Sequence, residues 1–130
     1  MRYRLLGNTG LRVSELFLGT MAYGAPGGLS ESDARRVLDH YADAGGNVVD
    51  TANFYGDGRS ERVVGELLAG RRDRFVLATK YTVTRDPTDP NAAGNHRKNL
   101  VPSLEESLRR LRTDYIDLYW VHMWDRYTPV

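Results

Sequence analysis

The sequence predicts an α/β domain in which parallel strands alternate with helices. Three observations support this fold class: short apolar runs recur along the chain, amphipathic segments with capping residues separate them, and a glycine-bounded turn near the N-terminus joins two short alternating runs. The repeated order of strand and helix calls for a parallel sheet with right-handed crossovers. Two architectures have this order, an open doubly wound sheet and part of an eight-stranded barrel.

The composition is that of one soluble domain. The chain has 130 residues, of which 41% are apolar, and this is enough to form a core. The net charge of +1 is spread without long runs of one sign, so we expect no nucleic-acid partner. No apolar run approaches the length of a membrane span, and we expect no membrane association. The absence of cysteine suits a cytoplasmic location.

The first elements along the chain are expected to be a hairpin, a strand and a helix. Residues 3–7 and 11–14 alternate on either side of an Asn-Thr turn and predict the hairpin. Residues 15–20 form the first apolar strand, and a glycine-rich loop follows it. Ser30 is expected to cap a helix, with Asp33 at the capping-box position, and a pair of glycines ends that helix.

Three more strands follow, with a second helix after the first of them. Residues 47–49 predict a short buried strand that runs out at Asp50. Ser60 is expected to cap the second helix. Residues 75–80 and 115–122 predict the third and fourth strands. The fourth is nearly continuous in apolar residues, as expected for a strand that is covered on both faces.

A third helix is predicted between the last two strands, after a long loop at residues 81–95. Its apolar stripe consists of Leu100, Leu104, Leu108 and Leu111. Pro102 lies within this stripe. Either the helix begins at this proline, or the helical residues before it are kinked by it.

Four titratable side chains lie at the ends of three successive strands. Asp50 and Tyr55 come directly after the second apolar strand, Lys80 closes the third and His122 closes the fourth. Because the carboxyl ends of parallel strands meet at one edge of a sheet, we expect these side chains on one face. Only two of the 18 basic residues are lysines, so a lysine at a strand end suggests chemistry that arginine cannot supply.

The sequence does not carry the dinucleotide fingerprint of doubly wound sheets. The glycine-containing segment 56–61 begins like that fingerprint, but Glu61 stands where the last glycine belongs, and the segment follows the second strand instead of the first. A Tyr-x-x-x-Lys pair is also missing, since Tyr81 is followed at that spacing by Arg85. These two observations weigh against a doubly wound nucleotide-binding domain.

Four segments, in order, resemble the aldo-keto reductase family. They are residues 3–21, residues 48–56 with Asp50 and Tyr55, residues 78–80 with Lys80, and residues 107–122 with His122. More narrowly, they are similar to the branch that includes aryl-alcohol dehydrogenase-like enzymes and the potassium-channel β subunits. The resemblance implies a (β/α)8 barrel closed at its bottom by an N-terminal hairpin. Residues 1–130 would supply the hairpin and four βα units, which is about the N-terminal half of the barrel.

The resemblance implies hydride transfer between NADPH and a carbonyl substrate, with a catalytic tetrad of Asp50, Tyr55, Lys80 and His122. Tyr55 would donate the proton to the carbonyl oxygen. Lys80, held by Asp50, would be the cation that favours the phenolate. His122 can donate a second hydrogen bond to the same oxygen. We assign no metal ligand.

The resemblance also suggests residues for the cofactor and the substrate. The nicotinamide end of the cofactor is expected near Gly19, Thr20, Met21 and Asp50. Three aromatic residues, Tyr23, Phe54 and Trp124, are expected to form pocket walls for an aromatic or medium-sized aldehyde, because loops at the carboxyl ends of barrel strands line the pocket.

The length of the chain bears on these expectations. A barrel of this kind takes about 250 residues, so we expect the 130-residue chain alone to be no competent reductase. Its edge strands would pair with another chain, either as a homo-oligomer or with a complementing C-terminal half. The alternative function is a regulatory or binding protein on the same fold, since the channel β subunits share these motifs.

Overall fold

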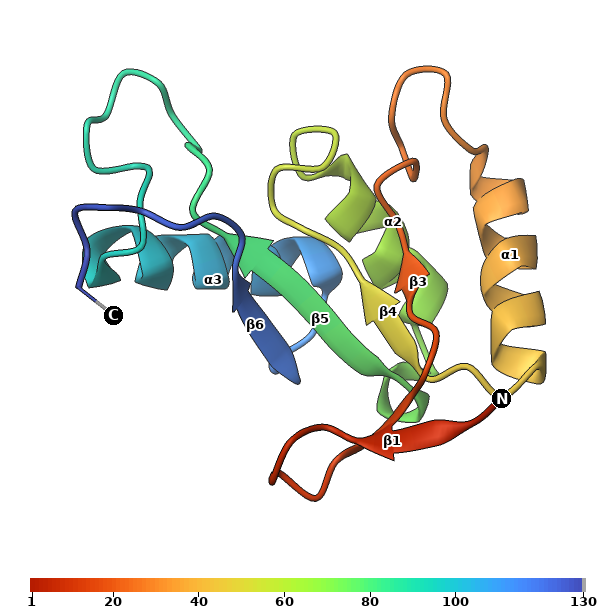
Figure 1. Ribbon diagram of the computed structural model, residues 1–130. Coiled ribbons are helices and arrows are strands. Elements are labelled where there is room, and N and C mark those ends of the chain that lie inside the picture. The colour runs from red at the N-terminus through yellow and green to blue at the C-terminus, as the bar shows by residue number, and fades with distance from the viewer. Residues whose placement is uncertain (130) are drawn as a thin grey trace.

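The computed structural model describes residues 1–129 and shows a small hairpin beneath a parallel sheet that is backed by helices (Figure 1). The strands are β1 (Tyr3–Leu5), β2 (Arg12–Ser14), β3 (Leu18–Gly19), β4 (Val48–Asp50), β5 (Val76–Tyr81) and β6 (Leu118–Val121). The helices are α1 (Glu31–Asp43), α2 (Arg59–Leu68) and α3 (Arg97–Leu111), with one turn of 3-10 helix at Arg72–Arg74. The predicted α/β class, the hairpin and the alternation of strands and helices are confirmed.

The sheet has the strand order β3-β4-β5-β6, and each neighbouring pair is parallel. Each strand therefore lies beside its neighbour in the sequence. Right-handed crossovers that always step in one direction place every helix on the same face of the sheet. A doubly wound sheet reverses direction and is covered on both faces. The strand order is thus that of a barrel wall.

Local hydrogen bonds define where the helices begin. Ser30 caps α1 as predicted, and its Oγ accepts the N–H of Asp33 at 3.1 Å. The prediction that Ser60 caps α2 is wrong, because the cap is Gly58 with a φ of +77° and Ser60 lies inside the first turn. There its hydroxyl is buried and donates to the carbonyl oxygen of Thr20, in the loop after β3, instead of accepting a backbone N–H of the helix.

Helix α3 begins well before Pro102, so the first of the two alternatives, a start at the proline, does not hold. The N-cap is His96, whose Nδ1 accepts the N–H of Asn99 at 3.3 Å. From the sequence this histidine is expected only as a surface residue. Pro102 lies inside the helix, where its missing N–H leaves the carbonyl of Lys98 without a helical donor.

Two strands of the parallel sheet are shorter than the sequence predicts, and so are both strands of the hairpin. Only Leu18 and Gly19 pair in β3, against an expected strand at residues 15–20. In β6 the backbone pairing with β5 begins at Leu118. One position earlier the side chain of Asp117 contacts β5 instead, because its Oδ2 accepts the N–H of Leu77 at 2.8 Å. Side-chain hydrogen bonds of this kind are not visible in an apolar pattern.

Two apolar clusters lie on opposite faces of the sheet. The larger one contains Val49 and Leu77 and is shared with all the helices. The smaller one joins Val48 and Val76 to Val13 of the hairpin. Because side chains alternate along a strand, Asp50 and Lys80 lie on the same face as the smaller cluster, further toward the carboxyl ends of the strands.

No helix within residues 1–129 is long and apolar enough to cross a membrane.

Candidate active site

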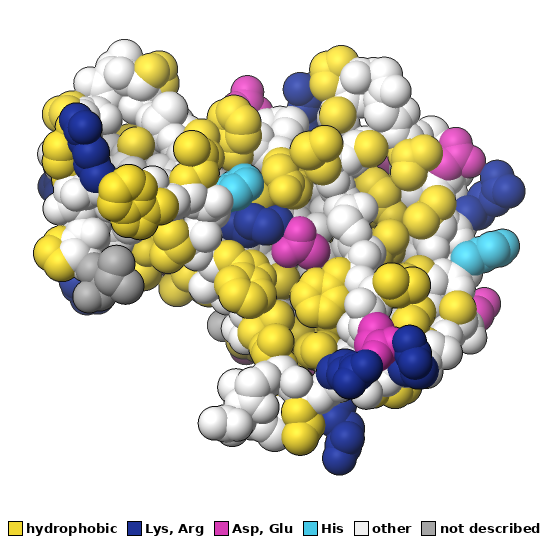
Figure 2. All heavy atoms as spheres, viewed as in Figure 1, with side chains coloured by type: hydrophobic (Ala, Val, Ile, Leu, Met, Phe, Trp, Pro, Cys, Tyr) yellow, Lys and Arg dark blue, Asp and Glu magenta, His cyan; other side chains and the backbone are white. Residues whose placement is uncertain are grey.

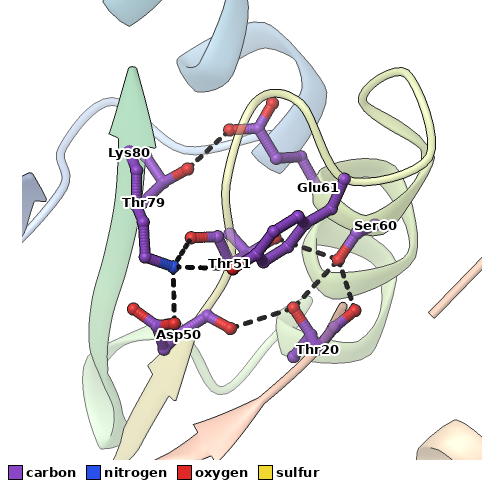
Figure 3. A network of polar contacts seen from close by, with 8 residues as sticks. Thr20, Asp50, Thr51, Ser60, Glu61, Thr79 and Lys80 are labelled. Carbon is purple, nitrogen blue, oxygen red and sulfur yellow. Dashed lines mark hydrogen bonds and ion pairs between the residues drawn. The ribbon is translucent and has the colours of Figure 1, made fainter. Parts of the chain in front are cut away.

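The ammonium of Lys80 is the centre of the site. Its Nζ donates to Oδ2 of Asp50 at 2.6 Å and to the carbonyl oxygen of Thr51 at 2.7 Å. A third contact, at 3.3 Å, reaches the hydroxyl of Tyr55. Figure 3 shows Lys80 on β5 with its amine directed at the end of β4. An ammonium has three N–H donors, so these contacts use all of them.

The pair of Lys80 and Asp50 is partly withdrawn from water. The Lys80 side chain is 15% exposed and that of Asp50 is 23% exposed. Charges at this depth are screened less than surface charges, so their attraction is stronger than that of an exposed pair. In Figure 2 a basic, an acidic and a histidine side chain gather on this face among apolar side chains. The pairing fixes the position of the ammonium relative to Tyr55.

The phenol of Tyr55 lies between a cation and an imidazole. The loop that carries it turns through residues with positive φ, Gly56 at +58° and Asp57 at +57°, directly before α2. The Nζ of Lys80 lies 4.9 Å from the centroid of the phenol ring. The ring of His122 meets it edge-on, with centroids 5.8 Å apart and an interplanar angle of 86°. The structure therefore brings the four residues of the predicted tetrad together.

His122 continues the β6 backbone beyond the sheet ladder. Its N–H donates to the carbonyl oxygen of Tyr81 at 2.9 Å and to Oγ1 of Thr82 at 3.2 Å. Burial lowers the pKa of its imidazole, the charge of Lys80 lowers it further, and Asp50 opposes both effects. The imidazole is thus neutral at neutral pH and has one N–H to donate. Its Nδ1 is buried without a hydrogen-bond partner among the described residues.

Two cavities meet at the tetrad. The first has a volume of about 490 Å³ and is lined by Phe17, Gly19, Asp50, Lys80, Trp120, Val121 and His122. The second has a volume of about 820 Å³, and its side-chain walls include Met21, Phe54, Tyr55, Val83, His122 and Met123. His122 lines both. Lys80 and Asp50 face the first cavity and Tyr55 faces the second, so the four residues form the boundary between two spaces.

The residues predicted to bind the cofactor are distributed around this boundary. Gly19 and Asp50 line the first cavity. A Cβ at Gly19 would meet no atom within 4 Å, so the backbone there borders open space. Met21 lines the second cavity. Thr20 is fully buried, and its hydroxyl points away from both cavities toward Ser60 and the carbonyl of Asp50.

The predicted pocket walls are placed differently from one another. Phe54 lines the second cavity and is 51% exposed. Tyr23 lies in the core at 2% exposure, with its hydroxyl donating to the carbonyl of Ala34 at 3.4 Å. Trp124 is 77% exposed and borders neither cavity. The structure thus brings one of these three aromatic residues to the site.

Several residues of the site are not singled out by the sequence motifs. Phe17 and Trp120 form apolar walls of the first cavity. The alternation of β6 could have indicated Trp120. This residue lies two positions after Leu118, which packs against the smaller apolar cluster, so both side chains point to the same face of the sheet. The carbonyl of Thr51, which accepts from Lys80, carries no sequence signal, because every residue has a carbonyl.

Comparisons with known proteins agree with this geometry. Residues 15–130 match the sequence profile described as the Aldo/keto reductase family. The chain is 50% identical over 133 aligned residues to a norsolorinic acid reductase of Emericella nidulans, an alignment that covers 93% of this chain and 34% of that protein. A protein of Saccharomyces cerevisiae with an aryl-alcohol dehydrogenase name is 41% identical over 138 residues, covering 95% of this chain and 65% of its own length.

A solved structure supports the fold directly. The aldo-keto reductase AKR11C1 from Bacillus halodurans, in its holo form, superimposes with a TM-score of 0.79 at 39% identity, over 92% of this chain and 39% of that chain. The hairpin and the four parallel strands therefore correspond to part of the predicted barrel. The chain spans about a third of the length of the norsolorinic acid reductase that it matches.

Proposed function

The chain belongs to the aldo/keto reductase family, and from this premise we propose that it carries the catalytic tetrad of an oxidoreductase that reduces an aldehyde or ketone to an alcohol with NADPH. The observation that supports the proposal most strongly is the Lys80 ammonium. It contacts Asp50 and the hydroxyl of Tyr55 at once, with the imidazole of His122 against the same phenol.

Each member of the tetrad has a defined role in this reaction. A carbonyl that accepts hydride develops negative charge on its oxygen, and in this proposal Tyr55 donates the proton there. Lys80 stabilises the phenolate that is left, and Asp50 holds Lys80 in place. The neutral imidazole of His122 can donate a hydrogen bond to the same oxygen while the charge develops.

The first cavity fits the nicotinamide end of the cofactor. Its volume of about 490 Å³ is in the range of small-molecule pockets. Apolar walls at Phe17 and Trp120 suit a flat ring, and the free space at Gly19 admits close approach of that ring to the backbone. Bound there, NADPH would supply the hydride. Gly19 and Asp50 would hold it, and the side chain of Met21 would border the substrate.

The second cavity suits an apolar or aromatic carbonyl substrate. Apart from Tyr55 and His122, its side-chain walls include Met21, Phe54, Val83 and Met123, which present thioether, aromatic and aliphatic groups. A ring could stack against Phe54, and the sulfur atoms can contact aromatic edges. The names of the relatives, norsolorinic acid reductase and aryl-alcohol dehydrogenase, are consistent with this choice. We therefore propose an aromatic aldehyde or ketone.

The proposal is tested by aldehyde-dependent oxidation of NADPH. Because the relatives are much longer, the assay uses the chain alone and the chain joined to the C-terminal part of a relative, and turnover is expected in the joined form. Tyr55→Phe should lower turnover by about 10²–10⁴-fold, the usual contribution of a positioned acid, with little change in NADPH affinity. Tyr127→Phe, at an exposed tyrosine outside both cavities, is the matched control.

Two outcomes would contradict the proposal. If Tyr55→Phe retained most of the turnover, another group would be the proton donor. If the joined form bound NADPH but no aldehyde or ketone caused its oxidation, the regulatory alternative on the same fold would be favoured instead.

A further inference from the structure

A buried hydroxyl lies directly behind the site, on the helix side of the sheet. Ser60, in the first turn of α2, is fully buried. Its Oγ donates to the carbonyl oxygen of Thr20 at 2.8 Å and lies 2.9 Å from the hydroxyl oxygens of Thr20 and Thr51. Figure 3 shows these contacts converging on Ser60 from the segments that follow β3 and β4. One side chain therefore ties two strand ends to a helix.

The Ser60 hydroxyl links Thr51 to the rest of this network. A serine hydroxyl has one proton to donate and two lone pairs that accept. Its proton goes to the carbonyl oxygen of Thr20, so the hydroxyl of Thr51 donates to Ser60. The Thr20 hydroxyl has a further acceptor, the carbonyl oxygen of Asp50 at 3.1 Å. Loss of the Ser60 hydroxyl would therefore leave the buried Thr51 hydroxyl without its hydrogen-bond partner, at a cost in free energy.

The network continues through Thr51 to the ammonium of Lys80. The Thr51 hydroxyl contacts Ser60, and its N–H donates to the carbonyl of Ala78 at 2.9 Å. With both groups held, the direction of the Thr51 carbonyl is fixed, and this carbonyl accepts from Lys80 at 2.7 Å. Lys80 contacts Thr51, Asp50 and Tyr55 at once, so the position of one acceptor influences the approach to the others.

We propose that Ser60 is a positioning residue: by anchoring Thr51 from behind the sheet, it sets the orientation of the Lys80 ammonium toward Tyr55. Ser60 lines neither cavity, so it acts only through its partners. The inference rests on the proposed function in that the contact between Lys80 and Tyr55 serves proton donation. The placement of the ammonium by Ser60 can be measured without turnover.

The titration of His122 reports the position of Lys80. The groups that face its ring are Lys80, Asp50 and Tyr55. A displaced ammonium and entry of water weaken the two effects that lower the His122 pKa. Ser60→Ala should therefore raise the titration midpoint of His122 by a few tenths of a unit. Carbon-13 NMR of labelled histidine measures this midpoint, and His122→Asn identifies the resonance among the three histidines.

Ser107 offers a matched control for this substitution. It is also fully buried, but its Oγ has no hydrogen-bond partner among the described residues, and it lies in α3, away from the site. Ser107→Ala thus removes the same atom at the same burial without breaking a hydrogen bond. It should leave the His122 midpoint unchanged. Equal midpoints for Ser60→Ala and Ser107→Ala would overturn the proposal.

A second pair of variants decides the matter if Ser60→Ala fails to fold. Thr51→Val keeps the shape of the side chain and the carbonyl but removes the hydroxyl that contacts Ser60, whereas Thr51→Ser keeps the hydroxyl. Thr51→Val should shift the His122 midpoint upward, and Thr51→Ser should restore the original value. A Thr51→Val midpoint equal to that of Thr51→Ser would overturn the proposal independently.

A kinetic measurement separates this inference from the proposed function. In the joined form, Ser60→Ala should lower kcat by about 10-fold, because small misplacements of catalytic groups are costly, while KM changes little. If the midpoint shifts but no carbonyl is reduced by any form, the function fails and the positioning role stands. If carbonyls are reduced normally and the midpoint of Ser60→Ala does not move, the positioning role fails alone.

Discussion

The two faces of the sheet differ in how completely they are covered. On the helix face, even a charged side chain is fully buried and hydrogen-bonded. Glu61 accepts from Thr79 at 2.7 Å and from Arg110 at 3.2 Å, and it has no exposed surface (Figure 3). On the opposite face, large apolar side chains remain open to solvent. Phe17 and Trp120, which line the first cavity together with the charged pair of the site, are each 41% exposed.

This difference separates stability from chemistry within the same strands. Along β5, alternate residues point to opposite faces, so Leu77 and Thr79 face the helices while Lys80 faces the cavity. Free energy of folding comes mainly from the dry face, because burial of apolar area stabilises. The open face contributes less and keeps its groups accessible to a ligand. Substitutions on the two faces should therefore have effects of different kind and size.

The largest expected effect is on stability from truncation of the helix face. Leu77 has no exposed surface and belongs to the larger cluster, so Leu77→Ala should destabilise the fold by about 3 kcal/mol through lost burial and a residual cavity. Val121→Ala, on the half-exposed edge strand, should cost less than about 0.5 kcal/mol. Urea denaturation midpoints measure both. Similar losses would show that the exposed edge of the sheet is as tightly packed as its covered face.

A smaller effect is expected from the buried ion pair on the helix face. Arg110→Met leaves the carboxylate of Glu61 with only Thr79, and this should cost about 1–3 kcal/mol because a buried charged acceptor loses its partner. Arg109→Met, at an exposed arginine with no ion pair among the described residues, is the control. Adding Glu61→Gln to Arg110→Met should recover part of the loss, since it removes the unpaired charge. No recovery would point to packing by the arginine stem instead.

The edges of the open sheet predict a weaker, concentration-dependent effect. Within residues 1–129, β3 and β6 each pair on one side only, and exposed edges invite pairing with another chain. The 130-residue chain should therefore sediment with a mass that rises with concentration. Val121→Lys, on β6, should reduce this association. Val37→Lys, at an exposed valine of α1, should not. A compact monomer at all concentrations would contradict the prediction.

The sequence predicted the proximity of the four tetrad residues better than the limits of the elements. Asp50, Lys80 and His122 follow apolar runs that parallel strands bring to one edge, so topology alone places them together. Tyr55 lies in a loop whose turns no periodicity describes. Its place shortly after the strand of Asp50 predicted that it lies at this edge, and the family resemblance suggested its role. The choice between barrel and doubly wound sheet likewise needed that resemblance, because both share the alternation of strand and helix.

The missed features are those that depend on contacts distant in sequence. Serine is a residue type that often caps helices, but the hydroxyl of Ser60 contacts Thr51 and Thr20, which are 9 and 40 positions away in the sequence. Tyr23 has the chemistry of a pocket wall, yet its ring lies in the core, where its hydroxyl donates to the carbonyl of Ala34 in α1. A single sequence shows which groups are present but not which face of a loop they occupy.

The smallest effect is a pH dependence of stability that originates on the open face. Burial and Lys80 hold the pKa of His122 below its ordinary value of 6.5. The unfolded chain therefore binds this proton at a higher pH than the folded one, so stability rises with pH up to about 6.5 and this contribution then levels off.

Three variants test this pH dependence. His122→Asn should remove the slope of stability against pH. Lys80→Met should reduce it, because burial is then the remaining cause that lowers the pKa of His122. His40→Asn, on α1, should keep the slope because His122 is still present. Urea midpoints between about pH 5 and pH 7.5 provide the test. A slope that survived in His122→Asn would have to come from groups outside the site.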